Sequence, residues 1–131
     1  MRSKRCTATC CAHRAPAPEA KSARPLTATG LAGFTDAKGV IVGTTQLVLD
    51  QPENQPHRAD LAKMLVHRSA RRQGLAERLL RAAEDTAREC GKTLLVLDTV
   101  TGGDAERLYT RLGWQRVGSI PDYALWPQGD A

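Results

Sequence analysis

The chain has 131 residues, of which 41% are hydrophobic and 25% charged, and this composition suits one small globular domain. No apolar run reaches the ~18 residues of a membrane-spanning helix, so we expect no membrane partner. The formal net charge of +5 lies entirely in residues 1–25, which hold six Lys or Arg and one acid, whereas residues 26–131 are neutral. The basic character therefore belongs to one segment, and we predict no nucleic-acid partner for the rest of the chain.

Residues 1–25 show no hydrophobic periodicity and are rich in Ala, Pro, Arg and Ser, so we expect a disordered basic tail before a single domain over residues 26–131. A nucleic-acid-binding arm and a transit peptide are the alternatives for this tail. It contains three cysteines and a histidine (Cys6, Cys10, Cys11 and His13). Their spacing matches no usual zinc pattern, so we predict no metal site. Nothing indicates a disulfide framework, which favours a reducing cytoplasm.

Regular patterns begin at residue 40. Val40–Leu49 is rich in β-branched residues and predicts a strand, and Ala59–His67 predicts a second one after a proline-containing loop over Asp50–Pro56. Apolar residues then recur at helical spacing from Leu75 to Cys90, with charged residues on the other face. This part of the chain therefore predicts two strands followed by an amphipathic helix.

The remaining elements are shorter. Lys92–Asp98 is an apolar run typical of a buried strand. A helix is predicted over Ala105–Leu112, with Asp104 as its N-cap, and Trp114–Val117 begins another strand. The order β-β-α-β-α-β predicts an α/β fold, in which a mixed sheet has flanking helices and at least one parallel pair of strands.

A basic turn joins the second predicted strand to the first helix. Arg71 and Arg72 precede Gly74, which leads directly into the helix. The first N–H groups of a helix have no intrahelical partner and carry the positive end of its dipole, so they suit a pyrophosphate. The glycine permits close approach and the arginines add charge-assisted contacts. A basic turn that binds nothing is the alternative, and we expect nearby His67 to line the surface or a cleft.

Two motifs resemble those of the GNAT acetyltransferases. Residues 71–76 (Arg-x-x-Gly-x-Ala) match the (Gln/Arg)-x-x-Gly-x-(Gly/Ala) motif with which the family binds acetyl-CoA, and residues 105–114 (Ala-x-x-x-Tyr-x-x-x-Gly-Trp) resemble its Ala-x-x-x-Tyr-x-x-x-Gly-Phe segment. The resemblance covers residues 40–127, the expected core of a GNAT-like domain. Three segments look most like the tabtoxin-resistance type, which acetylates a small amine toxin (Arg58–Val66, Leu97–Thr99 and Arg116–Tyr123).

The resemblance implies an acetyl-CoA-dependent N-acetyltransferase that acts on the amine of a small molecule, such as an antibiotic or toxin. The residues that it implies for acetyl-CoA binding are Met64, Leu65, Val66, Arg71, Arg72, Gln73, Gly74, Leu75 and Ala76. The main chain of the first three is expected to pair with the pantetheine arm, and an N–H group there to polarise the thioester carbonyl.

Three residues are candidates for catalysis. Tyr109 matches the family's tyrosine and is expected to protonate the departing CoA sulfur, the alternative being a tyrosine packed at the edge of the core. Asp98 ends an apolar strand, and Asp60 is expected on the preceding strand, on the same face as Met64 and Val66. We expect these carboxylates to hold the acceptor's ammonium group and to remove its proton. Solvated side chains or a helix cap are the alternatives.

The sequence departs from the family pattern in three places. Gly102 stands where the family commonly has an asparagine, seven residues before the tyrosine. Residues 1–39 show no amphipathic helix, although the family begins with a strand and helices that wall the acceptor site. The family also continues beyond Ala131 into a final strand that pairs with the one containing Trp114. We therefore expect a truncated member whose exposed sheet edge invites aggregation or pairing with another chain, a homodimer included. A catalytically weak or silent CoA-binding module is the alternative function.

Overall fold

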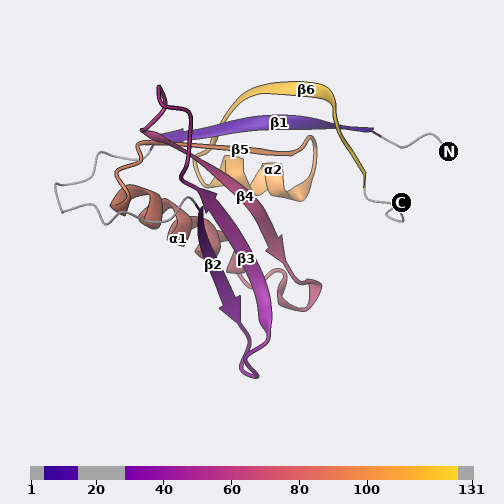
Figure 1. The fold of residues 1–131 in the computed structure, drawn as a ribbon. Coiled ribbons are helices and arrows are strands. Elements are labelled where there is room, and N and C mark those ends of the chain that lie inside the picture. Colours follow the sequence, from indigo (N-terminus) through magenta and orange to yellow (C-terminus); the bar gives the residue numbers. More distant parts are fainter. Residues whose placement is uncertain (1–4, 15–28, 127–131) are drawn as a thin grey trace. The chain divides into compact units, whose positions relative to one another are not determined.

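The computed structural model describes residues 5–14 and 29–126 (Figure 1). Their helices and strands are, in chain order, β1 (Arg5–Arg14), β2 (Thr29–Thr35), β3 (Ile41–Val48), β4 (Arg58–Val66), the 3₁₀ turn η1 (Arg68–Ala70), α1 (Leu75–Glu89), β5 (Leu94–Val100), α2 (Asp104–Arg111) and β6 (Gln115–Leu125). They fall into two compact units. We call residues 14–96 the central unit, and residues 1–13 together with 97–131 the terminal unit.

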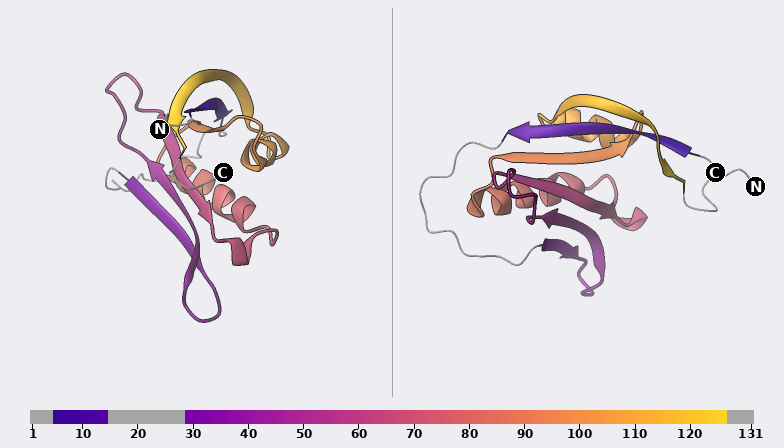
Figure 2. Two further views of the ribbon diagram at one scale, coloured as in Figure 1. Left: turned by 90° about the vertical axis from the view of Figure 1, so that its right-hand side faces the viewer. Right: turned by 45° about the horizontal axis from the view of Figure 1, so that its top comes forward.

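The central unit is a sheet with one helix against it. β2, β3 and β4 are antiparallel neighbours, and β4 pairs in parallel with the beginning of β5. α1 is the crossover that a parallel pair requires, and it lies along the strands in Figures 1 and 2. Its apolar stripe is buried, with Leu79 and Leu80 fully inaccessible to solvent. The α/β fold with a mixed sheet and flanking helices, predicted from the pattern of residues 40–117, is confirmed.

The terminal unit places the first strand of the chain beside the last. β1 neighbours both β5 and β6 in the sheet and is antiparallel to β6, from Arg5 opposite Leu125 to Ala12 opposite Gln115. The second view in Figure 2 shows β1 in indigo running along β6 in yellow. Thr9 of β1 is completely buried. β1 is thus an interior strand of this unit.

These findings correct two expectations. Arg5–Arg14 form a strand, so the expectation of disorder across residues 1–25 is wrong for this stretch; residues 15–25 lie outside the described ones. The strand after Trp114 was expected to lack its neighbour, but β1 pairs with it. An interior strand is buried on both faces and need not alternate polar with apolar residues, as adjacent buried Ala8 and Thr9 illustrate. That is why a periodicity search missed β1.

Candidate active site

α1 begins at a glycine, which has no side chain to cap the first N–H groups of the helix. Gly74 is the N-cap residue, has a left-handed φ of 72° and supplies no side-chain hydrogen bond to the cap. The N–H group of Arg78 donates to the Gly74 carbonyl at 3.1 Å, so those of Leu75, Ala76 and Glu77 precede the first intrahelical bond. A Cβ atom built on Gly74 would have no atom within 4 Å. This start of a helix is open and suits an anion.

The side chains of the preceding turn divide into two kinds. Arg71 Nε donates to the carbonyl of Val66 at 3.3 Å, and Gln73 Nε2 donates to that of Ser69 at 3.4 Å, so these two hold the turn together. Arg72 is exposed and has a φ of 62°. A residue with a side chain costs roughly 1–2 kcal/mol in this conformation. Such strain is often found at functional sites, and it accords with a binding role for Arg72.

His67 has a structural role beside this turn. It is the N-cap residue of η1, where Nδ1 accepts from the Ser69 N–H group at 3.2 Å and lies 2.7 Å from the Ser69 hydroxyl oxygen. The backbone N–H of His67 donates to the Val42 carbonyl at 2.7 Å. The side chain is exposed, as expected.

A β-bulge interrupts β4 at Lys63. Gln46 pairs with Ala62 and Thr44 with Leu65, so β4 has one residue more than β3 across this interval. Lys63 has a φ of 53°, which marks the irregular position. Bulges re-aim backbone and side-chain groups and are enriched beside active sites.

The extra residue reverses which face of the sheet each side chain occupies. Leu61 is buried and, through its partner Leu47, shares the face on which α1 packs. Asp60, one residue earlier, lies on the opposite face. Beyond the bulge, Met64 and Val66 pack against the α1 side, on the cluster of Ala70, Leu75 and Leu79. The expectation that Asp60 shares a face with Met64 and Val66 is therefore wrong, because it assumed unbroken alternation.

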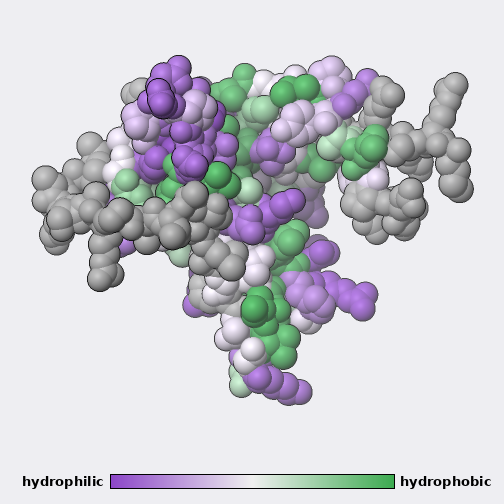
Figure 3. All heavy atoms as spheres, in the orientation of Figure 1, coloured by the Kyte–Doolittle hydropathy of each residue, from purple (hydrophilic) through white to green (hydrophobic). Residues whose placement is uncertain are grey.

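β4 extends beyond its pairing with β5. The parallel register covers Arg58–Asp60, and among the described strands none pairs with Leu61–Val66 on that side. Its amide groups there suit an extended ligand chain that adds to the sheet edge. Apolar side chains nearby are exposed, including Ile41 at 65% and Leu65 at 63%. In Figure 3 hydrophobic surface lies along the beginning of β3.

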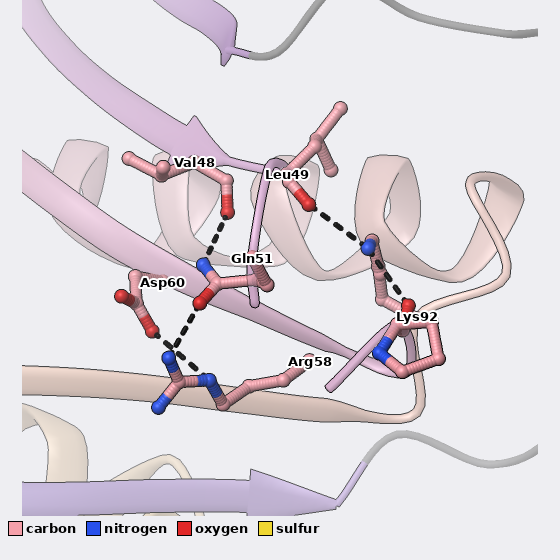
Figure 4. Close-up of polar contacts among 7 residues, drawn as sticks. Val48, Leu49, Gln51, Arg58, Asp60 and Lys92 are labelled. Carbon is pink, nitrogen blue, oxygen red and sulfur yellow. Dashed lines mark hydrogen bonds and ion pairs between the residues drawn. The ribbon is translucent and has the colours of Figure 1, made fainter. Parts of the chain in front are cut away.

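Asp60 lies in a small polar network of the central unit (Figure 4). Its Oδ1 is 3.8 Å from Arg58 Nε, and Arg58 Nη2 donates to Gln51 Oε1 at 2.5 Å. Gln51 in turn donates to the Val48 carbonyl at 3.1 Å. Lys92 anchors the loop before β4 by donating to two of its carbonyls. The Asp60 carboxylate thus stands beside a cation.

The other two catalytic candidates lie in the terminal unit. Tyr109 of α2 is 4% exposed. Burial raises its pKa to about 12, and the nearby Cys11 thiol and Asp98 carboxylate add to this shift. The phenol therefore holds its proton at neutral pH. Asp98 is exposed and lies two residues before the end of β5, not at the end as predicted. The arrangement of Asp98, Tyr109 and Asp60 around one acceptor stays a prediction.

The beginning of α2 differs from its expected form. Gly103 is the N-cap residue, and predicted cap Asp104 is the first helical residue. Glu106 Oε2 accepts from the Gly102 N–H group at 2.5 Å, in the manner of a capping box, and its Oε1 lies 3.6 Å from Arg116 Nη1. Glu106 thus takes, at the N–H group of Gly102, the role in the Thr101–Gly103 turn that was considered for Asp98.

Sequence reasoning missed the residues that β1 contributes around Tyr109. The His13 ring stacks on Trp114 with centroids 5.5 Å apart and an angle of 26°, and Trp114 lies 5.9 Å from the Tyr109 ring. Cys11 is buried, and burial raises the pKa of its thiol. The one sequence signal is the cluster of cysteines with His13, whose spacing fits no zinc pattern and favours unpaired thiols.

Across residues 5–14 and 29–126, no group of three or more His, Cys, Asp or Glu side chains is placed to hold a metal ion. Neither α-helix in these ranges has the length and apolar character needed to cross a membrane. The cytoplasmic location stays a prediction.

Comparisons with known proteins agree with the motifs and the fold described above. A sequence model of the acetyltransferase (GNAT) family matches residues 7–114, which include the turn before α1, Asp60, Asp98 and Tyr109. Solved GNAT structures share the fold. A protein from Novosphingobium aromaticivorans, described as an acetyltransferase of that family, is 17% identical with a TM-score of 0.67 over 88% of this chain.

Two further structures are similar over a shorter part of the chain. One from Klebsiella pneumoniae, described as an acyl-CoA N-acyltransferase, is 24% identical, with a TM-score of 0.62 over 73% of this chain and 74% of its own. An acetyltransferase from Trypanosoma brucei is 20% identical, with a TM-score of 0.60 over 70% of this chain and 65% of its own. The present chain spans 62% of the Novosphingobium protein.

Proposed function

The chain belongs to the GNAT acetyltransferase family, and on this premise we propose that it transfers an acetyl group from acetyl-CoA to the amine of a small molecule. The observation that carries the proposal is the open start of α1 at Gly74, inside the motif that resembles the family's acetyl-CoA-binding motif. The segments that resemble the tabtoxin-resistance type support an antibiotic or toxin as the acceptor.

The central unit offers hydrogen-bonding groups for two parts of acetyl-CoA, the pyrophosphate and the pantetheine arm. Its pyrophosphate would accept hydrogen bonds from the first N–H groups of α1, with Arg72 adding charge, while Arg71 and Gln73 keep the turn in shape. The amides of its pantetheine arm would pair with the backbone of Met64–Val66, in the part of β4 that extends beyond the residues paired with β5.

The residues of the terminal unit suit the chemistry. The amine nitrogen attacks the thioester carbonyl carbon, so a C–N bond forms, the C–S bond breaks and the nitrogen loses a proton. Buried Tyr109 keeps its proton at neutral pH and would donate it to the departing sulfur. We assign removal of the amine's proton to exposed Asp98. Asp60, which lies beside Arg58 in the central unit, stays a candidate for holding the acceptor's ammonium group.

A thermal-shift experiment with acetyl-CoA tests the binding half of the proposal. We expect acetyl-CoA to raise the melting temperature, and Gly74→Glu to abolish this shift, because a carboxylate at the helix start repels the pyrophosphate. Gly39→Glu is the matched control, since Gly39 also has a positive φ (81°) and open space at its Cβ position but lies in the turn before β3. The absence of a shift in the unaltered chain at millimolar acetyl-CoA would refute the proposal.

Turnover is tested separately by measuring CoA release chromatographically, which avoids thiol reagents that would react with the protein's own cysteines. The acceptors are amine antibiotics, polyamines and amino acids. Release that depends on one of these amines supports the transferase. Stabilisation by acetyl-CoA with no release across the panel would instead favour a catalytically silent CoA-binding module.

A further inference from the structure

His13 of β1 lies against Trp114, the residue that connects α2 to β6. The register that pairs Ala12 with Gln115 brings His13 opposite Trp114. Their rings are nearly parallel, 26° apart, with centroids separated by 5.5 Å. Trp114 is 3% exposed, so its indole is confined by the residues around it. Cross-strand ring contacts of this kind restrict side-chain orientation.

Trp114 is tied to Tyr109 by both backbone and ring. Its N–H group donates to the Tyr109 carbonyl at 2.9 Å, immediately after Gly113 with its φ of 90°. The two rings lie 5.9 Å apart at an angle of 53°, a tilted arrangement that aromatic pairs favour. Trp114 therefore forms the connection between the ring of His13 and the ring of Tyr109.

β1 is itself firmly held in the terminal unit. The hydroxyl oxygens of Thr9 and Thr101 are 2.7 Å apart, and the Thr101 N–H group donates to the Thr7 carbonyl at 3.0 Å. Thr9 and Cys11 are almost completely buried. The strand that carries His13 therefore has little freedom to move away from Trp114.

We propose that His13 is a positioning residue for Tyr109, acting through Trp114 to hold the phenol in the orientation needed for proton donation. The inference rests on the proposed function, in which Tyr109 is the proton donor. A displacement of about 1 Å at a reacting group lowers rates by up to about a hundredfold, so loss of the His13 ring would reduce turnover without affecting binding of the acyl donor.

A double-mutant cycle in the full chain tests this proposal, using acetyl-CoA and the most active amine of the panel. We expect His13→Ala to lower kcat about tenfold with KM for acetyl-CoA unchanged, and His13→Phe, which keeps a stacking ring, to restore most of it. In the Tyr109→Phe background, His13→Ala should lower kcat no further, because its effect passes through the missing hydroxyl. Multiplying effects of the two substitutions would overturn the proposal.

Two controls separate positioning from stability. Thr9→Val removes a tie of β1 without touching the ring stack, so it should lower the melting temperature while lowering kcat much less than His13→Ala does. His13→Leu replaces His13→Ala in the cycle if the alanine variant does not fold. If Tyr109→Phe itself leaves kcat unchanged, the assigned role of Tyr109 fails, which the cycle shows independently of His13.

A readout without turnover completes the test if no amine reacts. In a Tyr123→Phe background Tyr109 is the one remaining tyrosine, and its ionisation is followed by phenolate absorbance after a rapid pH jump. The neighbouring groups that influence this ionisation are the Cys11 thiol and the Asp98 carboxylate. His13→Ala should admit water around Trp114 and lower the Tyr109 pKa from about 12 toward 10.0. An unchanged titration would contradict the proposal.

Discussion

Tyr109 combines burial with a role that needs a retained proton. Its pKa is raised from 10.0 to about 12, first by burial and then by Cys11 and Asp98. A phenol in these surroundings remains neutral across the physiological range. The same burial that packs it beside Trp114 thus keeps the phenol protonated, so the packed-tyrosine alternative and the catalytic assignment are compatible.

The raised pKa of Tyr109 also predicts how stability depends on pH. Below pH 10 the residue is protonated in both states, and its contribution is fully present. As the pH rises to about 12 the unfolded chain loses this proton before the folded protein does, so the free energy of unfolding falls. A difference of about two between the folded and unfolded pKa values lowers the free energy of unfolding by about 2.7 kcal/mol once both states have lost the proton.

Denaturant titrations at a series of alkaline pH values measure this effect. Tyr109→Phe should show a shallower decline of the unfolding free energy between pH 10 and 12 than the unaltered chain. Tyr123→Phe, which removes a half-exposed tyrosine from β6, should retain the original decline. Parallel curves for the unaltered chain and Tyr109→Phe would contradict the assigned environment.

At the scale of elements, the helix that begins at the candidate acetyl-CoA site packs closely on β3. A Cβ atom at Gly43 would lie 3.0 Å from Leu75 Cδ2 and 3.1 Å from Leu79 Cδ1. The absence of a side chain at this position lets the first turn of α1 approach the sheet. The position of Gly74 and of the N–H groups that follow it depends on that approach.

Gly43→Val should therefore destabilise the protein by about 1–3 kcal/mol, since overpacking forces the two leucines from their positions. We further expect a smaller thermal shift with acetyl-CoA, because the start of α1 is displaced. Gly118→Val on β6 is the control, because a Cβ atom there has no atom within 4 Å. In chemical denaturation it should lower the free energy of unfolding much less than Gly43→Val does. Equal losses for the two variants would show that close packing at Gly43 is unimportant.

At the scale of the whole molecule, residues from both ends of the chain build one unit. β1 pairs with β6, and its Thr9 reaches Thr101 after β5. Two of the six basic residues in the segment 1–25, Arg5 and Arg14, therefore belong to a structural strand. The expectation that the strand after Trp114 lacks its neighbour is wrong on this account. β6 stands last in the strand order, so its other edge is unpaired among the described strands, and association between copies of the chain stays a prediction.

A buried charge in β1 tests this organisation directly. Thr9→Asp should lower the unfolding free energy by about 3 kcal/mol or more, because a carboxylate would replace a fully buried hydroxyl. Ala12→Asp, at a partly exposed position of the same strand, should lower the unfolding free energy less. Indistinguishable melting temperatures for the unaltered chain and Thr9→Asp would mean that residues 5–14 behave as a tail in solution.

The sequence alone determined the elements from β3 to α2 and the turn at Gly74. Those features are local: β-branched runs, helical spacing of Leu75, Leu79 and Leu80, and glycines at positive φ are set by neighbouring residues. The family motifs likewise placed Tyr109 on a short helix. Helix ends, for example the cap by Glu106 instead of Asp104, were less accurate because several polar residues compete for the same N–H groups.

Only the tertiary structure decided which distant residues meet. Nothing local in Arg5–Arg14 indicates a strand, since it forms by pairing with residues more than 100 positions away and by burial on both faces. The bulge at Lys63, which moves Asp60 to the face opposite Met64, is invisible to a pattern that assumes alternation. Strand pairing and ring stacking depend on the whole chain, and for that reason His13 could be assigned a role only after the fold was known.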